Sequence, residues 1–107
     1  MSRPLGNTSV AVLQAIAGGL QHGFDIIDAT GLASGTVYPA LGKLEAAGLV
    51  RSRWEDPRIA QREKRPPRRY YVLRPAGQQA LAEAVRRLRA LEKPITALRP
   101  LRGRGGS

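Results

Sequence analysis

The stretch SGTVYPALGKLEAAGLV, Ser34–Val50, decides the fold of this chain because its pattern predicts one well-defined helix. Ser34 is the predicted N-cap, and Gly48 is predicted to end the helix as the C′ residue. Between them, apolar residues recur at the spacing of one helix face, at Val37, Leu41, Leu44 and Ala47. The stretch therefore predicts an amphipathic helix with one side packed on a core.

The first turns of this helix are suited to close contact with phosphate. A helix start carries partial positive charge and free N–H groups, so it binds an anion without a charged side chain. Gly35 removes the side chain that would hold a phosphate away, and Pro39, near the start, gives up an N–H with little intrahelical work. Lys43 returns to the face of Thr36 two turns later. We predict a DNA-binding helix through Ser34, Gly35, Thr36, Tyr38, Pro39 and Lys43, although Tyr38 could instead pack on a neighbouring helix.

The flanking sequence predicts the remaining elements. Upstream lie two helices, Ser9–Ala17 with Thr8 as N-cap, and residues 22–30 ended by Gly31. Downstream, LVRSRWE and RRYYVLR read as strands, separated by the long basic loop DPRIAQREKRPP. Helical periodicity then returns from residue 75.

The order helix, helix, tight turn, helix, strand, loop, strand, helix is that of a winged helix-turn-helix. The predicted fold class is mainly α with a small β-hairpin, plus one C-terminal dimerisation helix. We expect a DNA-binding domain over residues 1–75, the dimerisation helix over 76–99 and a disordered basic tail over 100–107. Such a fold places its third helix in the major groove and its hairpin, the wing, along the backbone or in the minor groove.

Charge is strongly asymmetric along the chain. The 107 residues carry a formal net charge of +10, yet residues 1–50 hold only two basic side chains against three acidic ones. This asymmetry indicates a polyanionic partner that contacts the second half. The predicted phosphate contacts of the wing are Arg58, Arg62, Lys64, Arg65, Arg68 and Arg69. The alternative is a solvated loop kept soluble by its charge.

The last helix carries an apolar seam with alternating spacings of three and four. Such a seam docks on the domain's own core or on a second copy, and we favour the second copy. Pro94 is expected to end or kink this helix, which leaves Ile95 and Leu98 outside it or in a separate turn. The predicted dimer interface is Leu81, Ala84, Leu88 and Leu91. A dimer of this kind requires an approximately palindromic operator with half-sites about one helical turn apart.

The segments HGFDI, SGTVYPALGKLEAAGLVRSRWE, RRYYVL and PAG, in this order and spacing, resemble the PadR family of bacterial transcriptional regulators. The resemblance covers about residues 10–92. It implies a dimeric winged-helix DNA-binding protein, usually a repressor, with Tyr38 and its neighbours on the recognition helix. Two departures stand out: Arg74 occupies the place of the family's threonine before PAG, so the last helix loses its expected N-cap, and the wing tip is long and unusually basic.

The inventory of reactive groups argues against an enzyme. The chain has no cysteine, one histidine and no phosphate-binding Gly-Lys loop, so neither a metal site nor a cofactor is expected. His22 and Trp54 are expected to be structural, with Trp54 packed at the end of a strand. The N-terminus makes a poor signal peptide and no segment is apolar enough to cross a membrane, so we expect a cytoplasmic protein.

The predicted function is a sequence-specific regulator that binds double-stranded DNA. The main alternative is a small basic RNA-binding or ribosome-associated protein, which would explain the charge but needs neither a glycine-led helix start nor a dimer seam. A protein–protein adaptor with the winged fold is a third reading. The operator, the regulated genes, the sign of regulation and the existence of an inducer do not follow from the residues.

Overall fold

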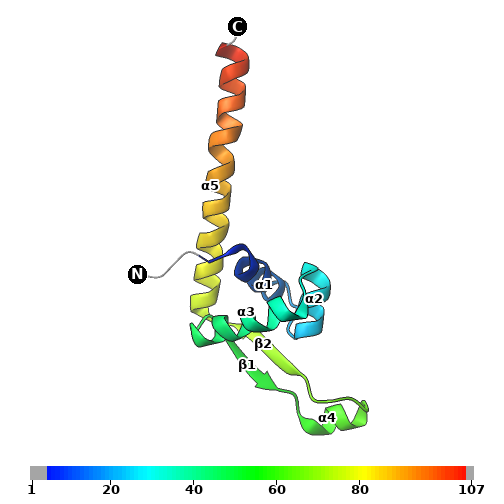
Figure 1. Ribbon diagram of the computed structural model, residues 1–107. Helices are drawn as coiled ribbons and strands as arrows, with labels where there is room; N and C mark the ends of the chain where they lie inside the picture. The colour runs from blue at the N-terminus through cyan, green and yellow to red at the C-terminus, as the bar shows by residue number, and fades with distance from the viewer. Residues whose placement is uncertain (1–4, 106–107) are drawn as a thin grey trace.

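The computed structural model describes residues 5–105, with side chains through Leu91. Its elements are α1 (Asn7–Ala17), α2 (Gly23–Thr30), α3 (Ser34–Ala46), β1 (Val50–Trp54), α4 (Pro57–Arg62), β2 (Arg69–Leu73) and α5 (Pro75–Gly105). In Figure 1, α1, α2 and α3 form a compact head, the hairpin projects from the head on one side, and α5 extends away on the other. The predicted winged helix-turn-helix with a C-terminal helix is confirmed.

The core lies where the first three helices meet, because each buries one apolar face there. Leu13 of α1, Ile26 of α2 and Leu41 of α3 are fully buried. Val50 of β1 and Tyr71 of β2 join them, so the hairpin base is part of the same core. Removing these side chains from water is the main force that holds the head together.

The hairpin is hydrogen-bonded to the head along the outer edge of β2. Strands β1 and β2 pair antiparallel in a register from Val50↔Leu73 to Trp54↔Arg69. On its other edge β2 meets the segment before α2, where the Tyr71 N–H donates to the Gln21 carbonyl at 2.7 Å and His22 pairs with Tyr70. Strand β2 is therefore held between β1 and the segment before α2, and the wing projects from a fixed base.

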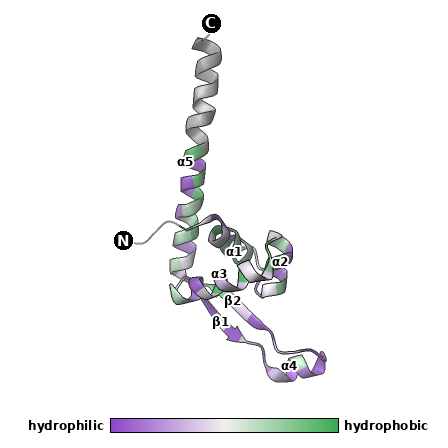
Figure 2. Cartoon of the chain, in the orientation of Figure 1, coloured by the Kyte–Doolittle hydropathy of each residue, from purple (hydrophilic) through white to green (hydrophobic). Residues whose placement is uncertain are grey.

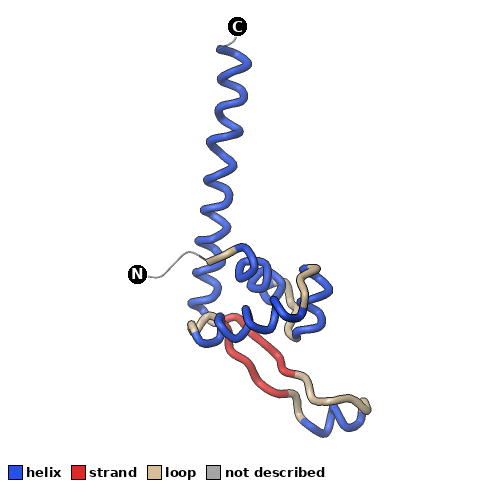
Figure 3. The backbone as a smooth tube through the Cα atoms, in the orientation of Figure 1, coloured by secondary structure: helices blue, strands red, loops and turns tan. Residues whose placement is uncertain are grey.

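The wing tip is not the structureless loop that we expected. Between the strands the chain forms the short helix α4, visible as a blue turn in Figure 3. Asp56 is its N-cap, accepting from the Arg58 N–H at 2.9 Å, and Pro57 opens the helix. Both are standard helix-start signals that the high local charge obscured.

Two predicted helix starts were also wrong. Ala33, not Ser34, is the N-cap of α3: it is extended and its carbonyl accepts from the N–H groups of Thr36 and Val37. Similarly α1 begins at Asn7 after Gly6, two residues before Ser9. The predicted ends are confirmed, since Gly31 and Gly48 adopt the left-handed conformation that glycine tolerates best.

Helix α5 begins where Gly77 touches the start of the hairpin. A Cβ at Gly77 would collide with the Leu49 carbonyl oxygen, so only glycine fits without a shift. The Arg74 N–H donates to the same carbonyl and the Gln78 N–H donates to the Arg74 carbonyl, both at 3.0 Å. These backbone bonds anchor the helix start although the family's capping threonine is missing.

Further along, α5 differs from our expectation. It continues through Pro94 to Gly105, past residue 99 and into the segment predicted as a disordered tail. A proline removes one backbone hydrogen bond, and the strong helix formers around it, leucine, alanine and arginine, favour continuation. The predicted seam residues Ile95 and Leu98 lie outside the described side chains, and residues 106–107 lie outside the described chain.

Candidate nucleic-acid interface

The exposed side of α3 carries the residues predicted to meet DNA. Ser34, Gly35, Thr36 and Lys43 are exposed, while Val37 on the opposite side is fully buried. Pro39 is exposed too, but it is the sixth residue of α3 and so lies past the first turn. The structure thus brings these residues onto one face of a helix whose other face is held in the core.

The N-terminus of α3 is open to an anion. Its N-cap, Ala33, has no side chain that could accept from the first-turn N–H groups, and the helix has no acidic residue in its first turn. The N–H groups of Ser34 and Gly35 and the helix dipole therefore remain available to a phosphate oxygen, whereas the Thr36 N–H already donates to the Ala33 carbonyl. Because the N-cap is Ala33 and not Ser34, no side chain of the cap residue competes with a phosphate for these N–H groups.

Tyr38 packs on a neighbouring helix, which is the alternative that the sequence left open for it. Its ring packs on the backbone of Gly23 at the start of α2, where a Cβ would meet the ring at 2.5–2.7 Å. The side chain nevertheless stays 45% exposed. Tyr38 therefore lies on the flank of α3 nearest the hairpin, fixed by α2 and still open to solvent.

The six predicted wing cations divide into two groups. Three are paired with carboxylates: Arg58 with Asp56 at 3.1 Å, Arg65 with Glu55 at 2.7 Å, and Arg69 with Glu45 of α3 at 3.4 Å. Within the described part of the chain, no ion pair involves Arg62, Lys64 or Arg68. Arg62 and Lys64 are exposed and Arg68 is half-buried. In Figure 2, much of β1 and part of α4 have the colour of hydrophilic residues.

Glu55 is the centre of the wing's internal contacts. It is 7% exposed and accepts from the Arg65 guanidinium at 2.7 and 2.9 Å, from the Tyr70 hydroxyl at 3.3 Å and from the Arg68 N–H at 3.3 Å. The bonds from Arg65, with those from Arg68 and Tyr70, lower the pKa of Glu55 from 4.5 to about 2, against the effect of desolvation. Arg65 therefore holds the base of the wing tip, and both of its terminal nitrogens already donate to Glu55.

The prediction that Trp54 packs as a structural residue is wrong. Its side chain is 63% exposed, and the Arg69 guanidinium lies over its ring at 5.4 Å from the ring centre. Trp54 is the last residue of β1, so the paired strands do not extend far enough to cover its ring. His22 fits its predicted structural role: it precedes α2, contacts Asp25 at 3.0 Å and meets the edge of the Tyr70 ring.

Sequence reasoning missed two further exposed cations. Arg51 and Arg53 lie on β1 and alternate with Val50 and Ser52, whose side chains face α3 and the core. The two-residue period of a strand was the signal that could have found them. They add positive charge to the face of the hairpin that points away from α3.

The four residues of the predicted dimer seam fall into a covered pair and an exposed pair. Ala84 is 2% exposed and Leu81 packs on the core of the same chain, so these two are already covered. Leu88 and Leu91 are 45% and 67% exposed. Only this second pair of the predicted seam remains free for a partner.

Two classes of site find no support in the described residues. Residues 5–91 contain no cluster of three histidine, cysteine or acidic side chains that could hold a metal ion. Across the described helices, none is both long enough and apolar enough to span a membrane.

Comparison with known proteins gives the fold and the family. A regulator of the PadR family from Clostridium difficile R20291 has 20% identity and a TM-score of 0.74, over 87% of this chain and 98% of its own. A PadR-like transcription factor from Bacteroides fragilis has 22% identity and a TM-score of 0.69, over 84% of this chain and 87% of its own. BpsR of Bordetella bronchiseptica, whose DNA binding is regulated by 6-hydroxynicotinic acid, has 18% identity and a TM-score of 0.67, over 95% of this chain and 80% of its own.

At these identities the solved structures show a shared fold. No curated protein matches the sequence significantly. The model of the PadR-like family of transcriptional regulators, however, matches residues 12–83, which include most of the head and the whole hairpin. Members of this family are DNA-binding regulators and not enzymes. The chain belongs to the PadR-like family of transcriptional regulators.

Proposed function

We propose that this protein is a dimeric repressor that binds a palindromic operator in double-stranded DNA. The observation that carries the proposal is the exposed face of α3, which presents Gly35 and Thr36 at a helix start without a side-chain cap and Lys43 in the last turn. Such a face can enter a major groove, where hydroxyls meet base edges and the helix start meets a phosphate. The cytoplasm, where the chromosome is accessible, is the compartment that this function requires.

The wing supplies affinity without sequence information. Arg62 and Lys64 lie at or next to α4 and are exposed, so they are the wing side chains best placed to contact phosphates beyond the major groove. Arg58 and Arg68 complete this set, whereas Arg65 is occupied by Glu55. Contacts of this kind strengthen binding to every duplex and make it depend on salt.

A second copy of the chain is the partner that fits the exposed end of the α5 seam. Leu88 and Leu91 line a groove of about 340 Å³ together with Leu5 and Val10 near the start of α1. In a twofold dimer, Leu88 and Leu91 of each copy would pack into this apolar groove of the other copy. The resulting twofold symmetry would place two copies of α3 on one face of a duplex.

A selection of genomic fragments tests the function directly. The purified protein is incubated with fragmented genomic DNA at about 150 mM salt, where non-specific binding is weak, and the enriched fragments are footprinted. We expect a short palindrome. Enrichment of nothing, with duplex binding only at low salt, would contradict the proposal, and tighter binding to RNA than to duplex DNA would favour the RNA-binding alternative.

The variants Thr36→Ala and Leu88→Glu test the two halves of the proposal separately. Thr36→Ala should reduce binding to the selected operator more than binding to random duplex, because it removes a group that meets base edges. Leu88→Glu should give monomers by light scattering and weaker operator binding, because it puts a charge in the apolar groove. Gln79→Glu, an exposed site near the start of α5, is the matched charge control. Loss of repression of an operator-controlled reporter in either variant would establish the sign of regulation.

A further inference from the structure

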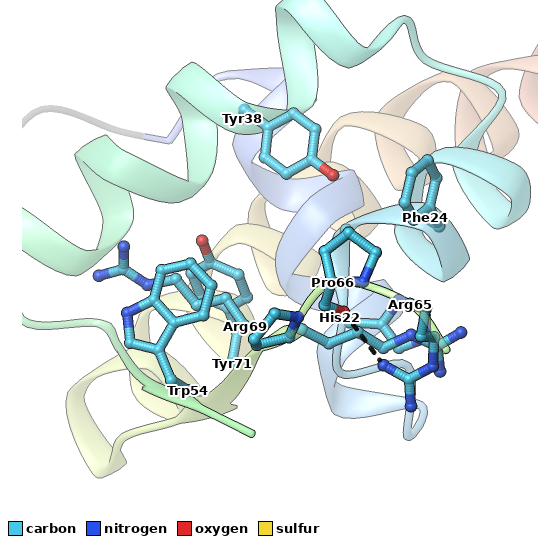
Figure 4. A pocket seen from close by; sticks show the side chains of 11 residues that line it. His22, Phe24, Tyr38, Trp54, Arg65, Pro66, Arg69 and Tyr71 are labelled. Carbon is cyan, nitrogen blue, oxygen red and sulfur yellow. Dashed lines mark hydrogen bonds between the residues drawn. The ribbon is translucent and has the colours of Figure 1, made fainter. Parts of the chain in front are cut away.

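A groove beside the recognition helix is lined by aromatic rings from three different elements. Phe24 at the start of α2, Tyr38 on α3 and Trp54 at the end of β1 all border it, and its volume is about 430 Å³. In Figure 4, Tyr38 lies at the top of the space, Trp54 at the lower left and Phe24 at the right, above the segment that follows α4. Phe24 and Trp54 are 68% and 63% exposed, which is unusual for rings of this size when they gather in one place.

The charges around the groove have one sign. Its lining residues include Arg65, Arg68 and Arg69 and no acidic residue. Arg65 and Arg69 are held in place by Glu55 and Glu45 behind them, while no carboxylate pairs with Arg68 among the described residues. A guanidinium has five donors, so a paired arginine keeps N–H groups for a second acceptor. The groove thus suits a ligand that is anionic and also has apolar surface.

The groove lies on the flank of α3 that faces the hairpin. Tyr38 borders it, and Glu45, two turns further along α3, bonds to Ser52 and Arg69 of the hairpin on the same flank. The exposed face of α3 adjoins this flank. When α3 enters the major groove of a duplex, one DNA strand lies at the edge of that major groove. This strand would therefore pass between α3 and the wing.

We propose that the groove binds one sugar–phosphate strand of the duplex, with Phe24 and Trp54 against deoxyribose and Arg68 and Arg69 against phosphate. The proposal rests on the function proposed above and adds aromatic contacts that the charge pattern did not predict. A sugar–phosphate strand alternates anionic phosphates with apolar C–H edges, which matches the alternation of arginines and rings around the groove. Since these contacts do not read bases, they act on every sequence alike.

Trp54 makes the test direct because it is the only tryptophan of the chain. Its emission is followed while duplex DNA is added to the full chain, and the anisotropy of labelled duplex is followed in the same titration. We expect the emission to be quenched or shifted with the same midpoint as the anisotropy. A rise in anisotropy with unchanged emission would overturn the groove proposal and leave the proposed function standing. No response in either signal would overturn both.

Phe24→Ala tests the groove independently of the fluorescent residue. Its ring is largely exposed, so the fold should tolerate the change. We expect about five- to tenfold weaker binding to operator and random duplex alike, because the variant buries less apolar surface against the strand. Gln14→Ala, an exposed site on α1, is the control and should leave binding unchanged. Unchanged binding by Phe24→Ala, or a Trp54 response to 6-hydroxynicotinate and none to duplex, would refute a strand in the groove.

Discussion

Helix α3 and the wing contrast in how they use their residues. Helix α3 has one basic side chain near its exposed face and buries Val37, Leu41 and Leu44 on the other side. The wing has eight basic side chains, and three of them bind carboxylates of the protein itself. The helix therefore carries the fold and presents a weakly charged reading surface, whereas the wing uses part of its charge to hold its place and shape.

This contrast shows that charge density alone overstates a binding surface. In the wing, Glu55 gathers Arg65, the Arg68 backbone and Tyr70 into one buried cluster, and only then are Arg62 and Lys64 presented at a defined place. In α3, the available donors near the helix start are backbone N–H groups, which composition cannot count.

The largest effect is expected in the buried face of α3. Leu41→Ala should lower the free energy of unfolding by about 2–5 kcal/mol, because it removes a fully buried side chain and leaves a cavity. The neighbouring Gly42→Ala is the control: no atom outside the helix lies within 4 Å of the added Cβ, so stability should rise by roughly 0.5–1 kcal/mol. Chemical denaturation measures both. Equal changes in the free energy of unfolding for the two variants would contradict the burial of Leu41 in the core.

Next in size is the loosening of the wing while the head stays folded. Glu55→Gln removes the charge that Arg65 binds, so the segment around α4 should exchange its amide hydrogens faster and be cut sooner by trypsin. The helices α1–α3 should keep their protection. Asp56→Asn keeps a good N-cap and removes only the exposed pair with Arg58, so it should change little. Equal loosening in the two variants would show that Glu55 has no special role.

A pH titration sharpens the same point. The pKa of Glu55 falls from 4.5 to about 2 on folding, so its charged form binds Arg65 more strongly than its protonated form does. The stabilisation is therefore complete above about pH 4.5 and is lost as the pH falls towards 2. The difference in unfolding free energy between the native chain and Glu55→Gln should shrink across this window. A constant difference would mean that the ion pair does not stabilise the wing.

The smallest effect concerns the salt dependence of DNA binding. Replacing Arg62 and Lys64 together by alanine should flatten the plot of log affinity against log salt, on operator and random duplex alike. The slope should change by about 0.9 for each phosphate that the variant no longer neutralises. Arg86→Ala, exposed on α5, is the control and should keep the original slope. An unchanged slope in the double variant would remove the wing tip from the interface.

Most of the fold could be predicted because its signals are local. The apolar spacing in α3, the glycines after α2 and α3, and the β-branched and aromatic runs of the strands lie within a few residues of the elements that they define. The errors at Ser34, at the wing tip and beyond Pro94 are also local, and arose where two signals competed. In the wing tip, a dense run of charge competed with the Asp-Pro start of α4.

The candidate site could be predicted only in part. The exposed face of α3 followed from helical periodicity, which places Thr36 and Lys43 on one side of the helix and away from the buried side of Val37. The state of the wing cations did not follow, because Arg69 meets Glu45 from 24 positions away and Arg65 meets Glu55 across α4. Likewise, the spacing of apolar residues along α5 did not distinguish the covered residues Leu81 and Ala84 from the exposed residues Leu88 and Leu91.

By itself, then, the sequence determined the order of the elements, the amphipathic recognition helix and the basic character of the second half. These properties depend on spacing along the chain, and neighbouring residues enforce them. Only the tertiary structure decided which arginines are free, that Trp54 is exposed, and that a groove of rings and guanidinium groups lies beside α3. Those properties depend on which distant residues come into contact, and that is settled by packing the helices and the hairpin on one core.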